Sequence, residues 1–178
     1  MAAPAQLLVT DPAGQRALWQ LREHGAGLAS RLPDGTEAWP GWEDAAVPPD
    51  RLGGYLREFT ALLAAHRRRG IIYGHFGEGC LHVRIDFELG TARGVADYRR
   101  FMTEAAELVV SYGGVFSGEH GDGQARAELY DRLLPAEVIQ AFAEFKAIWD
   151  PADRMNPGIK VRPVRLDRDL AGAGPARA

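Results

Sequence analysis

A regular alternation of polar and apolar side chains over residues 80–89 constrains the fold of this chain more than any other pattern. Apolar residues take every second position, and they are Leu81, Val83, Ile85, Phe87 and Leu89. The polar residues between them are Cys80, His82, Arg84, Asp86 and Glu88. A period of two is that of a β-strand, so the two sets lie on opposite faces. The pattern predicts a strand in a sheet that is covered on one side.

Other segments carry the spacing of amphipathic helices. Asp11-Pro12 predicts a helix start, because the carboxylate can cap the first turn and proline suits the first helical position. We expect this helix to end near residues 25–27, where two glycines stand. Its expected buried side comprises Leu18, Leu21 and Leu28. Further helices are expected over residues 49–69, 93–111, 124–133 and 135–149.

The remaining segments suggest the fold class and the domain limits. Short strands are expected at residues 71–73 and 115–116, and the proline-rich acidic stretch 32–49 is predicted as a long loop. Strands interleaved with helices, without strict β-α-β alternation, predict an α+β domain with an antiparallel sheet. We expect the folded part to span residues 11–161, between a loose start at 1–10 and a loose tail at 162–178.

Composition and charge exclude several classes of protein. With 46% apolar and 25% charged residues, the chain suits one globular domain. Its 21 Lys and Arg against 24 Asp and Glu leave a net charge of −3, which does not favour a nucleic acid or an anionic membrane as a partner. No apolar run approaches the ~20 residues of a membrane span. We therefore expect a soluble protein, with the cytoplasm as the default location.

Two absences limit the possible cofactor sites. Cys80 is the single cysteine, which rules out an internal disulfide and any cysteine-cluster zinc or iron–sulfur site within this chain. Neither a G-x-G-x-x-G nor a Walker sequence is present. A nucleotide cofactor would therefore need a different kind of binding site.

Histidines in glycine-dense segments give the main chemical signal. His75 and His82 flank the turn residues 77–79, so a hairpin would bring both imidazoles to one side of the sheet. Glu119, in the glycine-flanked loop SGEHGDG, is the natural third ligand of a two-histidine, one-carboxylate metal set. Zinc, manganese and ferrous iron all suit such a set. The next residue, His120, is the candidate general base beside the metal.

Simpler interpretations of the same residues stay open. The polar face of residues 80–88 is most often merely solvated, and strand histidines commonly bond to a carbonyl group. Glycines 118 and 121 can shape the loop around Glu119 for turn geometry alone. Cys80 is more typical of an inert buried thiol than of a ligand.

Three co-ordered motifs carry a family resemblance: YGHFGEGCLHVRI, SGEHGDG and DPADRMNPG. Together they resemble the C-terminal substrate domain of FAD-linked 2-hydroxyacid dehydrogenases, the family of D-2-hydroxyglutarate dehydrogenase, D-lactate dehydrogenase and the glycolate oxidase catalytic subunit. WPGWEDAAVPP and LREHGAG are most similar to large bacterial members in which an iron–sulfur module follows. The resemblance covers residues 11–161 and implies a ferredoxin-like α+β domain.

The resemblance also implies roles for matching residues. By it, the metal, expected to be zinc, would be held by His75, His82 and Glu119. His120 would take the hydroxyl proton while hydride leaves for FAD, and Arg22 in LWQLRE would bind the substrate carboxylate. Asn156 in NPGIK matches a segment that returns toward the flavin, as does Lys160 with one extra residue before it.

Two departures from the family pattern concern the substrate. Arg84 stands where D-2-hydroxyglutarate dehydrogenases commonly have an asparagine, and Trp42 stands near the place of a substrate-binding lysine. An arginine can bind a distal carboxylate through two parallel hydrogen bonds. Arg84 is therefore a second candidate substrate residue, and we expect a dicarboxylic 2-hydroxy acid rather than lactate.

The FAD-binding half of such enzymes precedes this domain, and residues 1–10 cannot supply it. We expect a fragment that depends on an FAD-binding domain or subunit and that neither holds flavin nor turns over alone. One alternative is a non-catalytic metal- or ligand-binding module. Another is a metal hydrolase with His120 as the base, although no H-E-x-x-H sequence is present.

Overall fold

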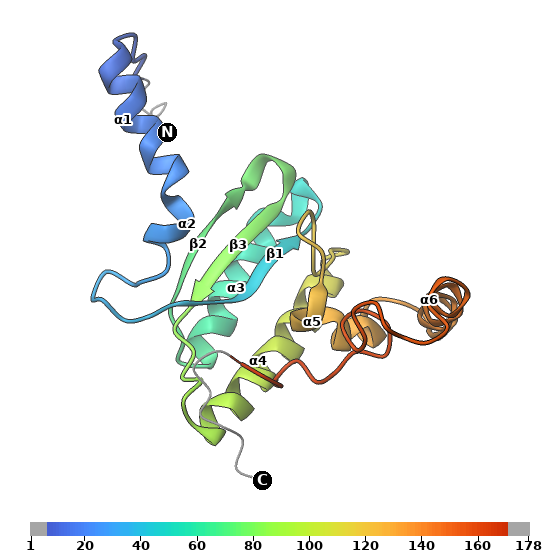
Figure 1. Cartoon of the computed structure of the whole chain (residues 1–178). Helices are drawn as coiled ribbons and strands as arrows, with labels where there is room; N and C mark the ends of the chain where they lie inside the picture. Colours follow the sequence, from blue (N-terminus) through green and yellow to red (C-terminus); the bar gives the residue numbers. More distant parts are fainter. Residues whose placement is uncertain (1–6, 171–178) are drawn as a thin grey trace.

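The computed structural model describes residues 7–170 of the chain (Figure 1). Three strands form its sheet: β1 (Trp39–Ala46), β2 (Gly70–His75) and β3 (Cys80–Ile85). The α-helices are α1 (Pro12–Glu23), α2 (Gly25–Leu28), α3 (Leu52–Ala65), α4 (Ala92–Ser111), α5 (Gly123–Arg126) and α6 (Ala136–Trp149). Short 3-10 turns are η1 (Pro49–Arg51), η2 (Phe76–Glu78) and η3 (Ala127–Arg132). None of the helices in residues 7–170 is both long and apolar enough to span a bilayer.

The sheet is antiparallel with the strand order β1-β3-β2, so β3 pairs on both sides. The alternation at residues 80–85 places the apolar side chains on the buried face of the sheet, as predicted: Leu81, Val83 and Ile85 are each 1% exposed or less. On the other face, His82 is paired in register with Tyr73 of β2 and Glu43 of β1. The central strand thus places one histidine in the middle of a polar face.

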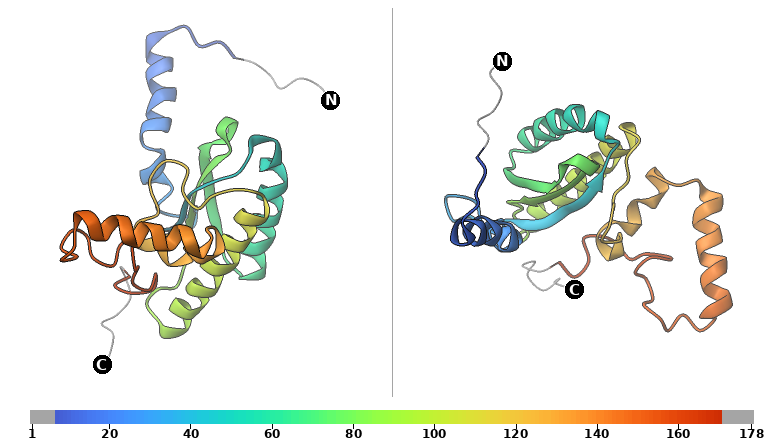
Figure 2. Two further views of the ribbon diagram at one scale, coloured as in Figure 1. Left: turned by 90° about the vertical axis from the view of Figure 1, so that its right-hand side faces the viewer. Right: turned by 90° about the horizontal axis from the view of Figure 1, so that it is seen from above.

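Helices α3 and α4 cover the apolar face of the sheet (Figure 2). Phe59 of α3 and Phe101 of α4 are both 0% exposed, and their ring centroids lie 6.0 Å apart in an edge-to-face arrangement. Burial of such rings stabilises each helix against the sheet more than helix propensity does. The α+β class with an antiparallel sheet covered on one side is confirmed, as are the helices near residues 49–69, 93–111 and 135–149.

Strand β1 corrects the prediction of a long loop over residues 32–49. The strand contains Pro40 and is interrupted by register shifts between Trp39 and Trp42 and between Glu43 and Ala45. These irregularities remove the regular alternation by which a strand is recognised. The expected strand at residues 115–116 is reduced to a single bridge between Val115 and Ala46.

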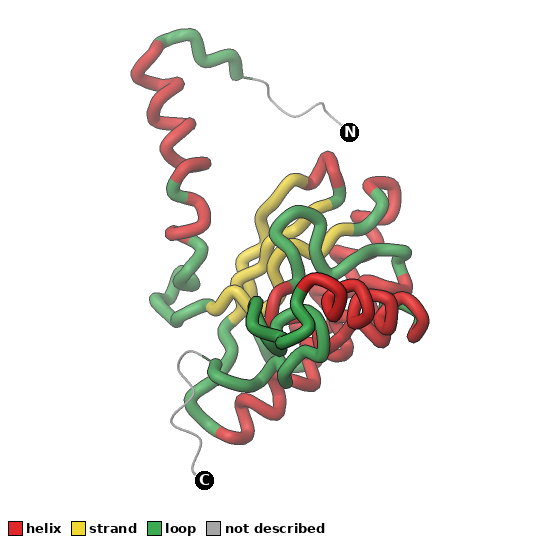
Figure 3. The backbone as a smooth tube through the Cα atoms, turned by 45° about the vertical axis from the view of Figure 1, so that its right-hand side comes forward, coloured by secondary structure: helices red, strands yellow, loops and turns green. Residues whose placement is uncertain are grey.

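Helix α1 begins as predicted, since Asp11 Oδ1 accepts a hydrogen bond of 2.6 Å from the N–H of Gly14. The prediction that the leucine side of this helix is buried is wrong. Leu18, Leu21 and Leu28 are 55%, 64% and 64% exposed. Figure 3 shows the reason, because α1 extends away from the sheet and its covering helices.

The C-terminal segment differs from the expected loose tail over its described part. Leu166 is 2% exposed, and its N–H donates a 2.8 Å hydrogen bond to Glu128 Oε2. Arg99 of α4 pairs with both Glu128 and Asp167, at 2.5 and 3.3 Å. This network anchors the segment around residue 166 on α4. Residues 1–6 and 171–178, which belong to the expected loose ends, lie outside the described part of the chain.

Candidate metal and substrate site

The β2–β3 hairpin brings His75 and His82 together, as the motif predicts. His75 ends β2, and the two ring centroids lie 5.9 Å apart with planes at 83°. The hairpin turns through η2 and through Gly79, whose φ is +75°. A Cβ at Gly79 would lie 1.9 Å from the carbonyl oxygen of Val47, so glycine is required there.

Glu119 completes the predicted trio. Its Oε1 lies 3.3 Å from His75 Nε2 and 3.4 Å from His82 Nε2. The His82 side chain is 9% exposed, whereas those of His75 and Glu119 are 42% and 47% exposed. Three side-chain atoms of the types that bind metals, from β2, β3 and a distant loop, therefore converge at a point that solvent can reach.

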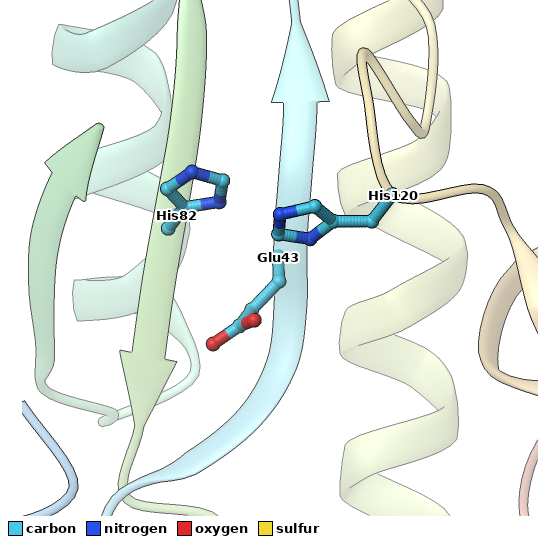
Figure 4. A group of neighbouring side chains, drawn as sticks. All are labelled: Glu43, His82 and His120. Carbon is cyan, nitrogen blue, oxygen red and sulfur yellow. The ribbon is translucent and has the colours of Figure 1, made fainter. Parts of the chain in front are cut away.

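His120 lies beside this trio in a different orientation. Its ring stacks on that of His82 with a centroid distance of 4.8 Å and an interplanar angle of 6°. Figure 4 shows the two rings facing each other, with Glu43 of β1 nearby. An ion lies close to the plane of each imidazole that binds it, and parallel planes do not meet at one ion. The arrangement thus favours a His75–His82–Glu119 ligand set over Glu43, His82 and His120, although the latter three also lie within ligand distance of one another.

Asp44, Cys80 and Glu119 form a third group of side chains within ligand distance of one another, but it is a poor ligand set. Burial, reinforced by the neighbouring Asp44 carboxylate, raises the pKa of the Cys80 thiol to about 12. A protonated thiol does not bind a metal well. Cys80 is buried, as expected of an inert thiol, and its Sγ donates to Asp44 Oδ1 at 3.4 Å.

Asp44 joins β1 to the loop that carries Glu119 and His120. Its side chain accepts hydrogen bonds from the N–H of Glu119 at 3.1 Å, from that of His120 at 2.7 Å and from the Ser117 hydroxyl. Burial by itself would raise the pKa of the Asp44 carboxyl, but these hydrogen bonds outweigh it and hold the pKa below its ordinary value. The carboxylate is thus an acceptor for the loop.

Arg126 of α5 holds the same loop from its other side. The residue is 6% exposed, and its guanidinium donates to the carbonyl oxygen of Glu43 and, at 2.8 Å, to that of Gly121. The described part of the chain buries four polar or charged residues, and Asp44, Arg126 and His82 are three of them. Buried polar groups of the domain are therefore concentrated at this site.

Of the two predicted substrate residues, the structure places the side chain of one. Arg84 lies two residues along β3 from His82, and its Nε is 2.6 Å from Glu43 Oε1. Both side chains of this pair are mostly buried, at 20% and 16% exposure. Arg22 lies in α1, but its side chain is outside the described part of the structure.

An open cavity of about 590 Å³ adjoins His75 and His82 on the side of α1 and α2. Apolar and aromatic side chains line much of it: Leu21, Leu28, Ile71 and Tyr73. The Tyr73 ring is tilted against that of His82, with a centroid distance of 5.3 Å. Such a cavity is large enough for a small organic acid with part of a second ligand.

Asn156 is not brought into the histidine cluster. It lines a separate groove of about 520 Å³, together with Phe145, Trp149 and Lys160. The Lys160 ammonium lies 3.7 Å from Asp122 Oδ2, in the segment that follows His120. Lys160 of the NPGIK motif thus contacts the segment that follows His120.

Comparison with known proteins places the chain in a family. A profile described as "FAD linked oxidases, C-terminal domain" matches residues 1–159. The chain belongs to this family. This confirms the resemblance carried by the three motifs.

The curated relatives of this FAD-linked oxidase domain are much longer. It is 33% identical over 153 residues to a D-2-hydroxyglutarate dehydrogenase of Haemophilus influenzae, and 32% identical over 158 residues to one of Escherichia coli. These alignments cover 86% and 89% of this chain but 15% of each relative. A D-lactate dehydrogenase of Archaeoglobus fulgidus is 34% identical over 119 residues, which are 67% of this chain and 26% of that protein.

Reasoning from the sequence missed Asp44, Arg126 and Glu43 at the site. Asp44 and Glu43 fell within the predicted loop, where acidic residues are ordinary. Arg126 follows SGEHGDG by three residues, but only the tertiary structure shows that its guanidinium contacts the carbonyl oxygens of Glu43 and Gly121.

Proposed function

We propose that this domain binds a small D-2-hydroxy acid and a divalent metal, and that it serves a flavin-dependent 2-hydroxyacid dehydrogenase. The observation that carries the proposal is the convergence of His75, His82 and Glu119, with His120 stacked beside them. The family supplies the coarse function, because its members are FAD-linked oxidases.

The ligand trio suits zinc. Bonds of 2.0–2.2 Å in a tetrahedron separate the ligand atoms by about 3.3–3.6 Å. Glu119 Oε1 lies 3.3 and 3.4 Å from the two histidine nitrogens, which is the separation that such a site needs. Two imidazoles and one carboxylate leave further positions for the oxygens of a substrate, and manganese or ferrous iron would also fit the donor set. Bound there, the metal would lower the pKa of the substrate hydroxyl and orient its C–H bond.

His120 would take the hydroxyl proton. Its ring is stacked on that of His82, its Nε2 lies 3.8 Å from Glu119 Oε1, and its side chain is 48% exposed. A neutral imidazole with access to solvent can accept a proton near neutral pH and release it later to water. His120 is thus proposed as the general base.

The arginines would hold the acid itself. Arg22 is proposed to bind the carboxylate next to the hydroxyl, and Arg84 a distal carboxylate on the side of β1. Arg84 is already paired with Glu43, but a guanidinium can serve two carboxylates at once, as Arg99 does with Glu128 and Asp167. A dicarboxylic substrate is consistent with this placement.

FAD would accept the hydride, and its main binding site would lie in a separate domain or subunit. Asn156 is proposed to contact the flavin from the groove beside α6. This groove and the exposed side of α6, with Phe145 66% and Trp149 71% exposed, offer an apolar surface for the FAD-binding partner. The proposal also includes an iron–sulfur module as a further partner and a cytoplasmic location.

The test begins with metal analysis of chain purified without chelators. We expect close to one divalent ion per chain, lost in His75→Ala and Glu119→Ala. The second step adds an FAD-binding domain of a related dehydrogenase and measures oxidation of D-2-hydroxy acids. Absence of metal would remove the ligand assignment, and a flavin band at full occupancy in the isolated chain would contradict the need for a partner.

A further inference from the structure

The carboxylate of Asp44 makes an unusual set of contacts for a buried acid. Asp44 is 0% exposed and has a φ of +75°, in the irregular part of β1. Its oxygens accept the N–H groups of two consecutive residues, Glu119 and His120, while its own carbonyl accepts the N–H of Gly118 at 2.7 Å. Every one of these bonds reaches the loop of the candidate site.

The contacts extend to the strand that carries His82. Cys80, the first residue of β3, donates to Asp44 Oδ1. Ser117 donates to Oδ2 and in turn accepts the N–H of Gly121 at 2.7 Å. Asp44 therefore connects β3, the strand that carries His82, to the loop that carries Glu119.

We propose that Asp44 is a positioning residue for the metal site: it holds the Glu119–His120 backbone at the distance from β3 that lets the ligand trio converge. The proposal rests on the proposed function, because it assumes that the trio binds a metal. A metal site tolerates errors of only a few tenths of an ångström in its ligands, and a loop rich in glycine does not hold them without support. Asp44 supplies that support without touching the ion.

If Asp44 only stabilised its loop, its loss would affect zinc binding no more than the loss of any other buried, loop-anchoring aspartate. Asp150 is such an aspartate. Asp150 is 8% exposed and accepts the N–H groups of two consecutive residues, Arg154 and Met155, each at 2.9 Å. It anchors a loop in the same way, but that loop follows α6 and carries none of the three ligands. Asp150→Asn is therefore a matched control for Asp44→Asn.

The experiment measures the zinc affinity of the 178-residue chain by competition with a chromophoric chelator, together with the visible spectrum of the Co²⁺-loaded chain. We expect Asp44→Asn to weaken zinc binding by about 10- to 100-fold, the range found when groups that orient metal ligands are removed. Its Co²⁺ spectrum should change, because the ligand geometry changes. Asp150→Asn should leave the zinc affinity within about twofold and the Co²⁺ spectrum unchanged.

Ser117→Ala provides a second route if Asp44→Asn does not fold, since it removes one donor and keeps the carboxylate. We expect it to weaken zinc binding by at least about threefold. Three outcomes would overturn the positioning role. Asp44→Asn could leave the zinc affinity unchanged, Asp44→Asn and Asp150→Asn could lower it equally, or Ser117→Ala could leave it unchanged. Failure of the unmodified chain to bind zinc, manganese or iron would instead overturn the proposed function, and the positioning role with it.

Discussion

The imidazole of His82 lies parallel to that of His120, at 4.8 Å between centroids and 6° between planes. His82 is nearly buried and directs its Nε2 toward Glu119 Oε1 at 3.4 Å, whereas His120 is half-exposed and stands 3.8 Å from the same oxygen. Two histidines in contact thus have different environments, one nearly buried and one half-exposed. The proposal assigns them different tasks, which can be separated by substitution.

We expect His120→Ala to retain zinc with an affinity within about threefold of the unmodified chain, because His120 is not a ligand in the proposal. His82→Ala should weaken zinc binding on the order of 100-fold or more, since one of three protein ligands is lost. Competition with a chromophoric chelator measures both. Equal losses in the two variants would show that His120 binds the metal.

Arg84→Gln tests the substrate side of the site. The zinc-loaded chain is titrated calorimetrically with D-2-hydroxyglutarate and with D-2-hydroxypentanoate, which have the same carbon chain but differ in the distal carboxylate. Loss of a charge-assisted pair costs about 1.5–3 kcal/mol, so Arg84→Gln should weaken binding of the dicarboxylate by about 10- to 100-fold. Binding of the monocarboxylate should change little. A parallel loss for both acids would argue against a distal contact.

Phe101→Ala should destabilise the domain by about 3–5 kcal/mol, because Phe101 is 0% exposed and packs on Phe59, Phe87 and His66. Urea unfolding followed by circular dichroism measures the free energy of unfolding. Phe145→Ala is the matched control, since Phe145 is 66% exposed and should cost less than about 1 kcal/mol. Similar losses at the two positions would contradict the described core.

The pH dependence of stability should include a contribution from Asp150. Its ion pair with Lys146 and hydrogen bonds from the N–H groups of Arg154 and Met155 lower its pKa from 3.8 to about 2. Because the folded-state pKa is the lower one, the carboxylate stabilises the fold above pH 4, and this contribution is lost as the pH falls toward 2. Urea unfolding at pH 5 and pH 3 should show a smaller loss of stability in Asp150→Asn than in the unmodified chain. An equal loss would mean that other carboxylates dominate.

The apolar side of α6 should cause self-association of the isolated chain. Phe145, Ile148 and Trp149 are 66%, 75% and 71% exposed and are spaced three and four residues apart, so they share one side of the helix. Analytical ultracentrifugation should detect species heavier than 19.4 kDa that increase with concentration. The double variant Phe145→Ser/Trp149→Ser should shift the chain toward the monomer, and unchanged association would place the contact on another surface.

Local patterns predicted much of the fold correctly. The alternation at residues 80–85, the helix start at Asp11-Pro12 and the glycine turn between His75 and His82 each depend on neighbours in the sequence, and the structure has all three. The metal trio was also predicted as a group, because glycine-dense motifs allow close approach of the backbone. Its assignment as a metal site stays a proposal.

The errors came from features that depend on distant contacts. β1 was predicted as a loop, because Pro40 and two register shifts hide its pairing with β3. The apolar side of α1 was expected to be buried, but amphipathic spacing shows only that a helix has an apolar side and not that the same chain covers it. Leu166 was expected in a loose tail, yet it is buried where Glu128 and Asp167 converge on Arg99.

The sequence by itself determined the main helices and the strands β2 and β3, which face of β3 is apolar and which residues have the chemistry of ligands and of a base, since these follow from residue type and short-range spacing. Only the tertiary structure decided that residues 39–46 form a strand beside β3, that Asp44 and Arg126 hold the loop of Glu119 and His120 between them, and that Glu43 pairs with Arg84. These contacts join residues far apart in the chain, and their geometry is set by the packing of β1 against β3 and of the glycine-rich loop against β1.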